Sequence, residues 1–148
     1  MINIDRIDHI GIRVADLDRA MAFYNIFGFK QLHAAENDAV VVMKNGQDVE
    51  INIIYNANNA NGGNNILMDV PDKYPGFTHV AFRVTSIADT VAALRENGIE
   101  ITQGPVAFGA DGHVSVFLRD PDRNTIELRG RAEDLSKLGG VEAYEPVN

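Results

Sequence analysis

The sequence DHIGIRVADL at residues 8–17 has a close counterpart in THVAFRVTSI at residues 78–87. Both copies place a histidine second, an arginine four residues after it, and a helix-capping residue seven residues after it. The stretch is therefore an internal repeat. It carries a potential metal ligand, His9 or His79, to equivalent places in the two halves of the chain.

The first half is predicted to form a βαβββ module over residues 4–55. Apolar and polar side chains alternate across residues 4–14, which is typical of a strand. Asp16 then caps a helix, and Gly28 stands where a helix commonly ends. Three more strands are expected, with an Asn-Gly turn before the last, over residues 29–34, 39–44 and 49–55.

The second half repeats this order over residues 77–130. Its first strand covers residues 77–84, Ser86 caps the helix, and Gly98 ends it. The remaining strands are expected over residues 99–102, 113–119 and 125–129, with a loop at 104–112.

Two segments lie outside the modules. Residues 56–65, within a linker of residues 56–76, are rich in asparagine and predict a surface connector or, alternatively, a lid. The tail, residues 131–148, is expected to hold one short helix near 133–138. The whole chain, residues 1–148, is thus predicted to be a single α+β domain of two βαβββ modules. One helix covers each sheet, and the modules form an open-barrel cleft with pseudo-twofold symmetry.

Composition excludes several classes of function. The chain has 148 residues, a net charge of −8 and no cysteine. Nucleic acids and anionic membranes repel an acidic surface, so neither is expected as a partner. Without thiols there are no disulfides, thiolate metal sites or cysteine nucleophiles. No leader or membrane-spanning run stands out, so a cytoplasmic location is expected.

Each half also offers one carboxylate to accompany its histidine. Glu50 and Glu127 lie in the last strand of their halves, each between two hydrophobic residues. In a strand such a glutamate points away from its apolar neighbours, so it lines the open face if these neighbours pack under the helix. Two imidazoles and two carboxylates would suit one divalent metal ion with positions left for water or substrate.

These motifs resemble the vicinal oxygen chelate superfamily, which includes glyoxalase I, extradiol dioxygenases, fosfomycin and bleomycin resistance proteins and methylmalonyl-CoA epimerase. The likeness is carried by DHIG, AFY and Gly28 in the first half and by HVAFRV, DPD and IEL in the second, and it covers residues 4–130. It implies a homodimer and one divalent ion of nickel, zinc, manganese, iron or cobalt. The implied ligands are His9, Glu50, His79 and Glu127.

Within that superfamily, glyoxalase I is nearest in ligand set. The resemblance implies isomerisation of the hemithioacetal of a 2-oxoaldehyde and a thiol, through an enediolate that the metal stabilises. Glu127 matches the proton-shuttling position, with Glu50 as the second catalytic carboxylate. Arg13 matches the position that binds a glutathione carboxylate, or is a surface arginine. Asn52 shares a strand face with Glu50 and is a substrate-pocket residue or an alternative ligand. His113 is a substrate-side acid or base, or an ordinary loop-edge histidine.

Three alternatives stay open. Methylmalonyl-CoA epimerase shares the DHIGI opening, and its enolate chemistry is closely related. An extradiol dioxygenase would bind iron(II) through His9, His79 and Glu127, but the tyrosine that such enzymes carry ten residues before the last glutamate is Phe117 here. A non-catalytic binding or resistance protein typically lacks the ligand residues, whereas this chain keeps all four.

Overall fold

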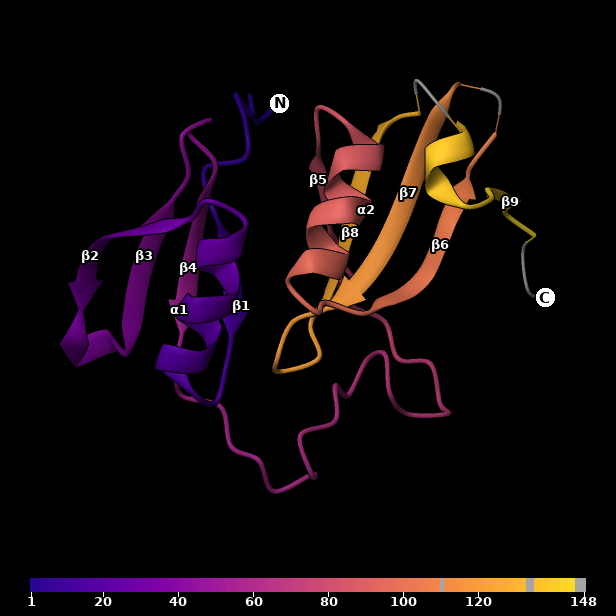
Figure 1. Cartoon of the computed structure of the whole chain (residues 1–148). Coiled ribbons are helices and arrows are strands. Elements are labelled where there is room, and N and C mark those ends of the chain that lie inside the picture. The colour runs from indigo at the N-terminus through magenta and orange to yellow at the C-terminus, as the bar shows by residue number, and fades with distance from the viewer. Residues whose placement is uncertain (110, 133–134, 146–148) are drawn as a thin grey trace. The chain divides into compact units, whose positions relative to one another are not determined.

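Each half of the repeat folds into its own β-sheet with one helix across it. The computed structural model describes residues 1–109, 111–132 and 135–145, in two units, Met1–Asn64 and Asn65–Asn148. The first unit holds β1 (Ile10–Arg13), α1 (Leu17–Ile26), β2 (Lys30–Ala35), a 3-10 helix η1 (Glu36–Asp38), β3 (Val40–Lys44) and β4 (Glu50–Ile54). Its strand order is β1-β4-β3-β2, with β1 parallel to β4 and the other neighbours antiparallel (Figure 1).

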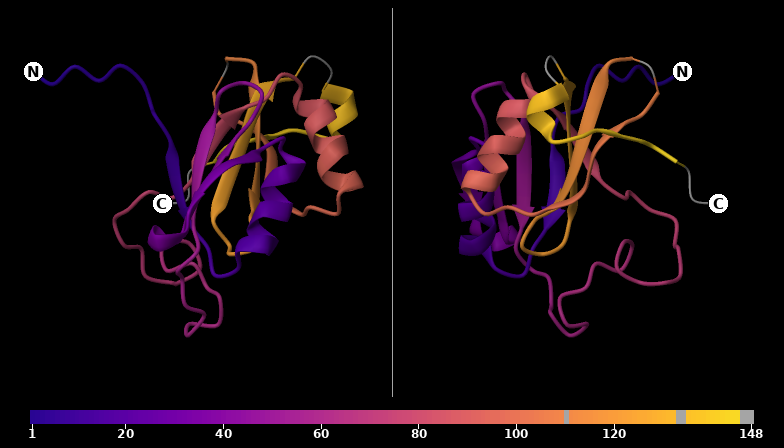
Figure 2. Two further views of the ribbon diagram at one scale, coloured as in Figure 1. Left: turned by 90° about the vertical axis from the view of Figure 1, so that its left-hand side faces the viewer. Right: turned by 45° about the vertical axis from the view of Figure 1, so that its right-hand side comes forward.

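Alternation along β4 explains how the first unit divides its polar and apolar side chains. Ile51 and Ile53 are completely buried, while Glu50 and Asn52 are only half-buried. Side chains alternate across a strand, so the two polar residues share the face opposite the isoleucines. The helix α1 buries Tyr24 completely and lies on one side of its sheet (Figure 2). The polar face of β4 is therefore the face that the helix leaves open.

Both helices begin and end as the repeat predicts. Asp16 caps α1 by accepting a hydrogen bond from a backbone amide at 2.9 Å, and Ser86 caps α2 (Ile87–Glu96) in the same way at 3.2 Å. Each cap contributes about 1 kcal/mol. Gly28 and Gly98 follow the helices with φ of 82° and 66°. This left-handed conformation ends a helix and is open to glycine at little cost.

The second unit repeats this order and adds one strand. It consists of β5 (Val80–Arg83), α2, β6 (Ile101–Ala107), β7 (His113–Arg119), β8 (Thr125–Arg131), a 3-10 helix η2 (Leu135–Leu138) and β9 (Glu142–Ala143). The strand order is β5-β8-β7-β6-β9, with β5 parallel to β8 and β9 parallel to β6. The helix α2 contacts β7 and β8 through a buried apolar stripe of Ile87, Val91 and Leu94 (Figure 2).

The predicted loop at residues 104–112 is wrong over its first half. The strand β6 runs on to Ala107 and keeps pairing with β7, although its register shifts twice. Gly104 makes this close pairing possible: its φ is 96°, and a Cβ at this position would lie 2.6 Å from the Ser115 carbonyl oxygen. Glycine and proline in sequence resemble a loop, but here they form an irregular strand.

Two other boundaries differ from prediction. The first strand begins only at Ile10, so residues 4–9 lack the partner strand that a ladder needs. In the tail, the predicted helix at 133–138 begins at residues outside the described part of the chain, and its described portion is the 3-10 turn η2. The two-residue strand β9 was not predicted.

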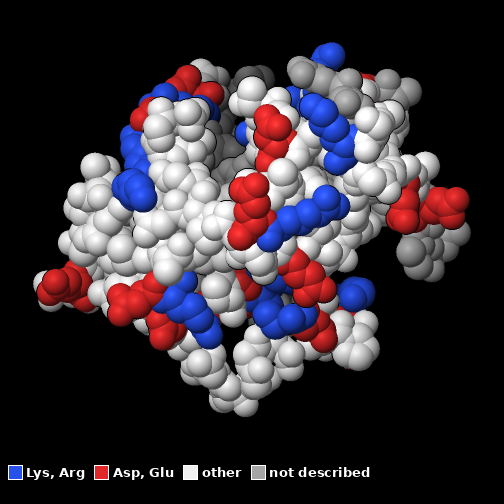
Figure 3. All heavy atoms as spheres, in the orientation of Figure 1, with Lys and Arg blue, Asp and Glu red and all other residues white. Residues whose placement is uncertain are grey.

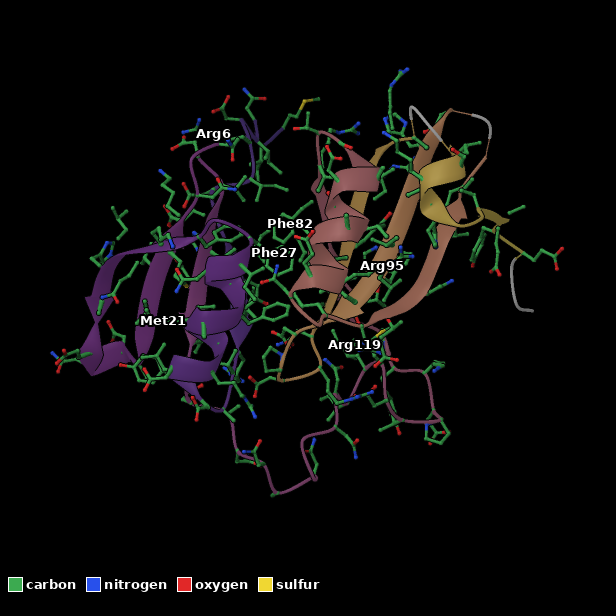
Figure 4. The ribbon with its side chains drawn as sticks, in the orientation of Figure 1. Arg6, Met21, Phe27, Phe82, Arg95 and Arg119 are labelled. Atoms are coloured by element: carbon green, nitrogen blue, oxygen red, sulfur yellow. The ribbon has the colours of Figure 1, made fainter. Side chains whose placement is uncertain are left out.

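A carboxylate in the linker is tied to the turn between β7 and β8. Asp69 accepts two hydrogen bonds from Arg123, at 2.5 and 2.8 Å, and Arg119 lies 3.4 Å from the same carboxylate. Hydrogen bonding to Arg123, above all, holds the pKa of Asp69 down to about 2. Figure 4 labels Arg119 at the end of β7 beside this linker segment. The contact anchors part of the linker to the second unit.

The predicted fold class, α+β with two βαβββ modules, is confirmed. Among the described residues, no helix has the length and hydropathy needed to span a bilayer. Acidic and basic side chains are interspersed on the face shown in Figure 3, with no continuous basic field there.

Candidate metal-binding site

In the first unit, the start of β1 and the start of β4 bring a histidine and a carboxylate together. His9 directly precedes β1, and Glu50 begins β4. Ile10 pairs with Ile51, so the parallel register sets the two preceding residues side by side. One ligand atom from each of Asp8, His9 and Glu50 lies within 4.8 Å of the others.

Asp8 determines the tautomer of His9. Its Oδ2 lies 2.8 Å from His9 Nδ1. A carboxylate can only accept, so Nδ1 carries a proton, and in the neutral tautomer Nε2 then keeps a free lone pair. The same hydrogen bond is the main cause that lowers the pKa of Asp8 below its usual value. A histidine oriented in this way by a carboxylate is a common arrangement in metal sites.

The second unit holds a tighter pair. His79 Nε2 lies 3.1 Å from Glu127 Oε2, and the glutamate is only 8% exposed. The Thr78 hydroxyl lies 2.9 Å from His79 Nδ1. Nε2 donates to the carboxylate in this structure. Because a hydroxyl can donate or accept, Thr78 allows the ring proton to move to Nδ1 and free Nε2 for a metal ion.

The other carboxylate oxygen of Glu127, Oε1, also accepts a hydrogen bond. The Ser115 hydroxyl donates to Glu127 Oε1 at 2.6 Å, and Ser115 is completely buried. Arg129 Nη1 in turn donates to the Ser115 oxygen at 3.3 Å. The arginine itself pairs with Asp111 at 2.7 Å. A buried carboxylate without such donors would be costly, so these contacts explain how Glu127 is accommodated.

The surroundings of Glu50 are different. The Lys44 Nζ lies 3.9 Å from the Glu50 carboxylate, while the same nitrogen lies 2.7 Å from Asp48. The hydrogen bond to Asp48 is the main cause that raises the pKa of Lys44. The Glu50 side chain is 24% exposed. Glu50 therefore sits at a wetter and less constrained place than Glu127.

Strand pairing does not match Glu50 with Glu127. In the parallel ladders, Gly11 pairs with Asn52, and Ala81, which occupies the same place in the repeat, pairs with Glu127. The antiparallel ladders agree: Lys44 and Arg119, the last residues of β3 and β7, pair with Glu50 and Thr125 respectively. The equivalence of Glu50 and Glu127 inferred from their apolar neighbours is thus wrong, and Asn52 occupies the place of Glu127.

Three residues were predicted to contact the substrate. Arg13 is exposed at the end of β1, and Asn52 lies two residues beyond Glu50 on the same face of β4. The Asn52 Oδ1 atom is buried and has no hydrogen-bond partner among the described residues. His113 begins β7, where its Nε2 accepts from Arg83 Nη1 at 2.8 Å.

His113 belongs to a polar cluster with Arg83 and Asp111. Its Nδ1 lies 3.2 Å from Asp111 Oδ2, within ion-pair distance but outside hydrogen-bond geometry. The amide of His113 donates to the other oxygen of Asp111 at 2.9 Å. This amide, followed by nearby Arg129, keeps the pKa of Asp111 below its usual value.

Sequence reasoning missed Asp8, Ser115 and Arg129. Alternation assigned Asp8 to the face opposite His9, but the two residues precede the strand, so alternation does not apply to them. Ser115 had a weak signal, as a small polar residue in the otherwise apolar centre of 113–119. Its partner in the ladder is Arg129, two residues from Glu127, which only strand register reveals.

The donor types fit a divalent metal ion. Each unit presents one imidazole and at least one carboxylate within a few ångströms, and the first unit adds the unpartnered amide oxygen of Asn52. Nitrogen and carboxylate oxygen donors of this kind bind zinc, nickel, manganese, iron(II) or cobalt. The described residues thus form one group of potential ligands in each unit.

Several known proteins have sequences or folds similar to this chain. The lactoylglutathione lyase of Salmonella typhimurium is 31% identical over 133 residues, which cover 83% of this chain and 90% of the lyase. A virulence protein of the same organism is 31% identical over 132 residues, 84% of this chain and 83% of its own length. The crystal structure of a glyoxalase family protein from Enterococcus faecalis has a TM-score of 0.64 at 28% identity, covering 84% of this chain and 96% of that one.

The family is also recognised directly. Residues 6–128 match the sequence profile of the Glyoxalase/Bleomycin resistance protein/Dioxygenase superfamily. This match spans both modules and includes the two repeat histidines together with Glu50, Asn52 and Glu127. The chain therefore belongs to the glyoxalase/bleomycin resistance protein/dioxygenase superfamily.

Proposed function

We propose that the chain is a metal-dependent, glyoxalase-I-like enzyme that converts the hemithioacetal of a 2-oxoaldehyde and a thiol to a 2-hydroxyacyl thioester. The observation that carries this proposal is the histidine–carboxylate pair in each module, His9 with Glu50 and His79 with Glu127. The similarity to lactoylglutathione lyases, at 31% identity, supports the reaction class.

His9, His79 and Glu127 would hold the metal ion, and Glu50 or Asn52 would supply a fourth ligand. When bound, a divalent ion supplies Lewis-acid polarisation of the two neighbouring substrate oxygens. All other chemistry in the proposal belongs to side chains of this protein.

Glu127 is the proposed proton carrier. The reaction moves one proton from the carbon that bears sulfur to the neighbouring carbonyl carbon, and the hydroxyl proton ends on the other oxygen, so no oxidant or reductant is needed. Burial keeps the Glu127 carboxylate away from bulk water. Because the Ser115 hydroxyl donates to Oε1, Oε2 on the His79 side would take and return the proton once His79 Nε2 no longer donates to it.

Substrate recognition is assigned to side chains near the open faces of the sheets. Arg13 is proposed to pair with a carboxylate of the thiol, as in a glutathione adduct, because guanidinium binds carboxylates in a bidentate manner. His113 is proposed as a neighbouring polar contact. A homodimer and a cytoplasmic location stay predictions.

Phe117, whose ring contacts His79, counts against the dioxygenase alternative. The ring of Phe117 lies 5.7 Å from the His79 ring, edge to face, and it has no hydroxyl to donate a hydrogen bond. An epimerase acting on a coenzyme A thioester shares the proton-transfer chemistry, so the two assignments are separated by substrate.

The decisive experiment is turnover by metal-loaded protein. Glu127→Gln should lower kcat for the methylglyoxal–glutathione adduct by at least about 100-fold, because it removes the group that transfers the proton. Glu100→Gln, at an exposed position of the same unit, is the matched control and should leave kcat unchanged. Methylmalonyl-CoA is tested in parallel. If the protein binds a metal ion but turns over neither substrate, the proposed activity is wrong.

Arg13 is tested by thiol preference. Arg13→Ala should raise KM for the glutathione adduct while leaving kcat, and turnover of adducts with uncharged thiols, nearly unchanged, because it removes only a contact to the glutathione carboxylate. An unchanged KM would remove Arg13 from the substrate site.

A further inference from the structure

We propose that the oxygen ligand of the first module is the amide oxygen of Asn52 and not the carboxylate of Glu50. The two modules would then contribute unequal oxygens, an amide from β4 and the Glu127 carboxylate from β8. The inference rests on the proposed function only in assigning the site to a metal ion. It is argued from strand register and from one buried atom.

Register identifies Asn52 as the structural counterpart of Glu127. Counting along β1 and β5 from the repeat histidines, Gly11 and Ala81 hold the same place, and their partners are Asn52 and Glu127. The antiparallel ladders give the same correspondence. Val42 and Phe117 each lie two residues before the end of their strand, and they pair with Asn52 and Glu127 respectively. By the same count, Glu50 corresponds to Thr125.

The Asn52 oxygen lacks a partner that a buried amide normally has. Oδ1 is buried and makes no hydrogen bond to any described residue. Leaving such an atom unsatisfied destabilises a folded protein, because the lost hydrogen bond to water is not replaced. A cation would satisfy it directly, because an amide oxygen is a good donor to hard and borderline divalent ions.

The residues around Asn52 explain why an amide stands there. Glu127 accepts a hydrogen bond from Ser115, and Arg129 in turn donates to the Ser115 oxygen, whereas the corresponding residues of the first module are Val40 and Ile54. These apolar side chains offer no hydrogen bond. An ionised carboxylate in that setting would lack compensating donors in the absence of metal, while a neutral amide is far less costly to desolvate.

The inequality has a chemical consequence. An amide oxygen cannot take up a proton near neutral pH, so of Asn52 and Glu127 only Glu127 can act as a base. Two carboxylates at these positions would each be able to accept a proton. With an amide at residue 52, the proton-accepting group of this pair would come from the second module alone.

Glu50 is the competing ligand, because it lies in the cluster with Asp8 and His9. Its side chain is 24% exposed, and its carboxylate lies 3.9 Å from Lys44 Nζ. If Glu50 affects the metal ion only through its charge and does not bind it, solvent and salt screen this charge, and its removal should change metal affinity little. Substituting Asn52 and Glu50 one at a time therefore shows which of them is the ligand.

The test measures binding of Co²⁺ and Ni²⁺ to the whole chain by calorimetry and by metal-dependent thermal stabilisation. Asn52→Leu, which keeps the branching at Cγ but replaces the amide oxygen and nitrogen with methyl groups, should weaken binding at least about tenfold. Asn52→Asp, nearly isosteric, should bind as tightly as the natural protein or more tightly. Glu50→Gln should change affinity by less than about fivefold.

A metal-free measurement guards against misfolding. Without metal, Asn52→Leu should melt at the same temperature as the natural protein or higher, because it removes an unsatisfied oxygen. Added metal should then raise the Tm of the natural protein and of Asn52→Asp much more than that of Asn52→Leu. A Tm that falls sharply for Asn52→Leu without metal would show that the oxygen has a structural partner, and would overturn the inference.

The outcomes separate this inference from the proposed activity. If Asn52→Leu binds metal like the natural protein and Glu50→Gln does not, Glu50 is the ligand and the inference is wrong, whatever the turnover. If Asn52→Leu loses metal but the natural protein turns over no hemithioacetal, the ligand assignment stands and the proposed activity fails. A natural protein that binds neither ion would overturn both.

Discussion

Replacing Asp69 by asparagine should destabilise the second unit in a pH-dependent way. The substitution keeps the size of the side chain and removes its charge. Asp69 is 7% exposed and faces Arg123 and Arg119, and hydrogen bonding to Arg123 is the main reason that its pKa falls from 3.8 to about 2. A pKa lowered to that extent corresponds to roughly 2 kcal/mol of stability. The Arg123 side chain is 49% exposed, so solvent screening reduces the expected value to about 1–2 kcal/mol.

The sign of the pH effect follows from the lowered pKa. Below pH 4 the unfolded chain takes up a proton at Asp69 more readily than the folded chain does. The stabilisation is therefore complete above about pH 4 and is lost as the pH falls towards 2. At pH 3 roughly half of it should remain.

Urea unfolding followed by circular dichroism at pH 7, 5 and 3 measures this effect. The free energy of unfolding of Asp69→Asn should be about 1–2 kcal/mol below that of the natural protein at pH 7 and 5, and the gap should narrow at pH 3. Asp72→Asn, at an exposed position in the same segment, is the matched control and should change stability by less than about 0.5 kcal/mol. A gap that is the same at all three pH values would refute the reasoning, because the loss would not come from the charge.

Three further changes test the fold and the surroundings of Glu127. Gly104→Ala should lower the free energy of unfolding, measured by thermal denaturation, by at least about 2 kcal/mol, because φ at this position is 96° and the new Cβ would lie 2.6 Å from a backbone oxygen. The control Gly46→Ala, whose new Cβ would have no atom within 4 Å, should be nearly neutral. Ser115→Ala should lower stability by about 1–3 kcal/mol and weaken metal binding, since it leaves a buried carboxylate oxygen without its donor; unchanged values would show that the hydrogen bond is absent. Asp16→Ala should cost about 1 kcal/mol in urea unfolding through loss of the helix cap, and a neutral result would contradict that role.

Local signals in the sequence were sufficient for most of the fold. The caps at Asp16 and Ser86 and the glycines at 28 and 98 act through hydrogen bonds and backbone angles within a few residues, so their spacing alone placed both helices. Alternation placed the central strands for a similar reason, because it reports which face of a strand is buried. The internal repeat then supplied the module order.

Non-local pairing explains the elements that prediction missed. The strand β6 continues through Gly104 because β7 pairs with it across two shifts of register, and β9 exists only because β6 offers an edge. Residues 4–9 have a strand-like pattern but no partner in the ladder. Whether a stretch becomes a strand depends on a partner distant in sequence, and a local pattern cannot show that partner.

The sequence by itself determined that two histidines and a set of acidic residues recur in two βαβββ modules, because a repeat is a property of residue order. Only the tertiary structure decided how the polar residues of the two modules correspond. Glu50 and Glu127 share a local frame, but strand register matches Glu127 with Asn52, and the Ser115 hydroxyl that donates to Glu127 comes from a neighbouring strand. The partners of a side chain across a sheet are set by the hydrogen-bond ladder. A shift of two residues keeps the same face of the strand, so the local pattern of apolar and polar residues cannot reveal it.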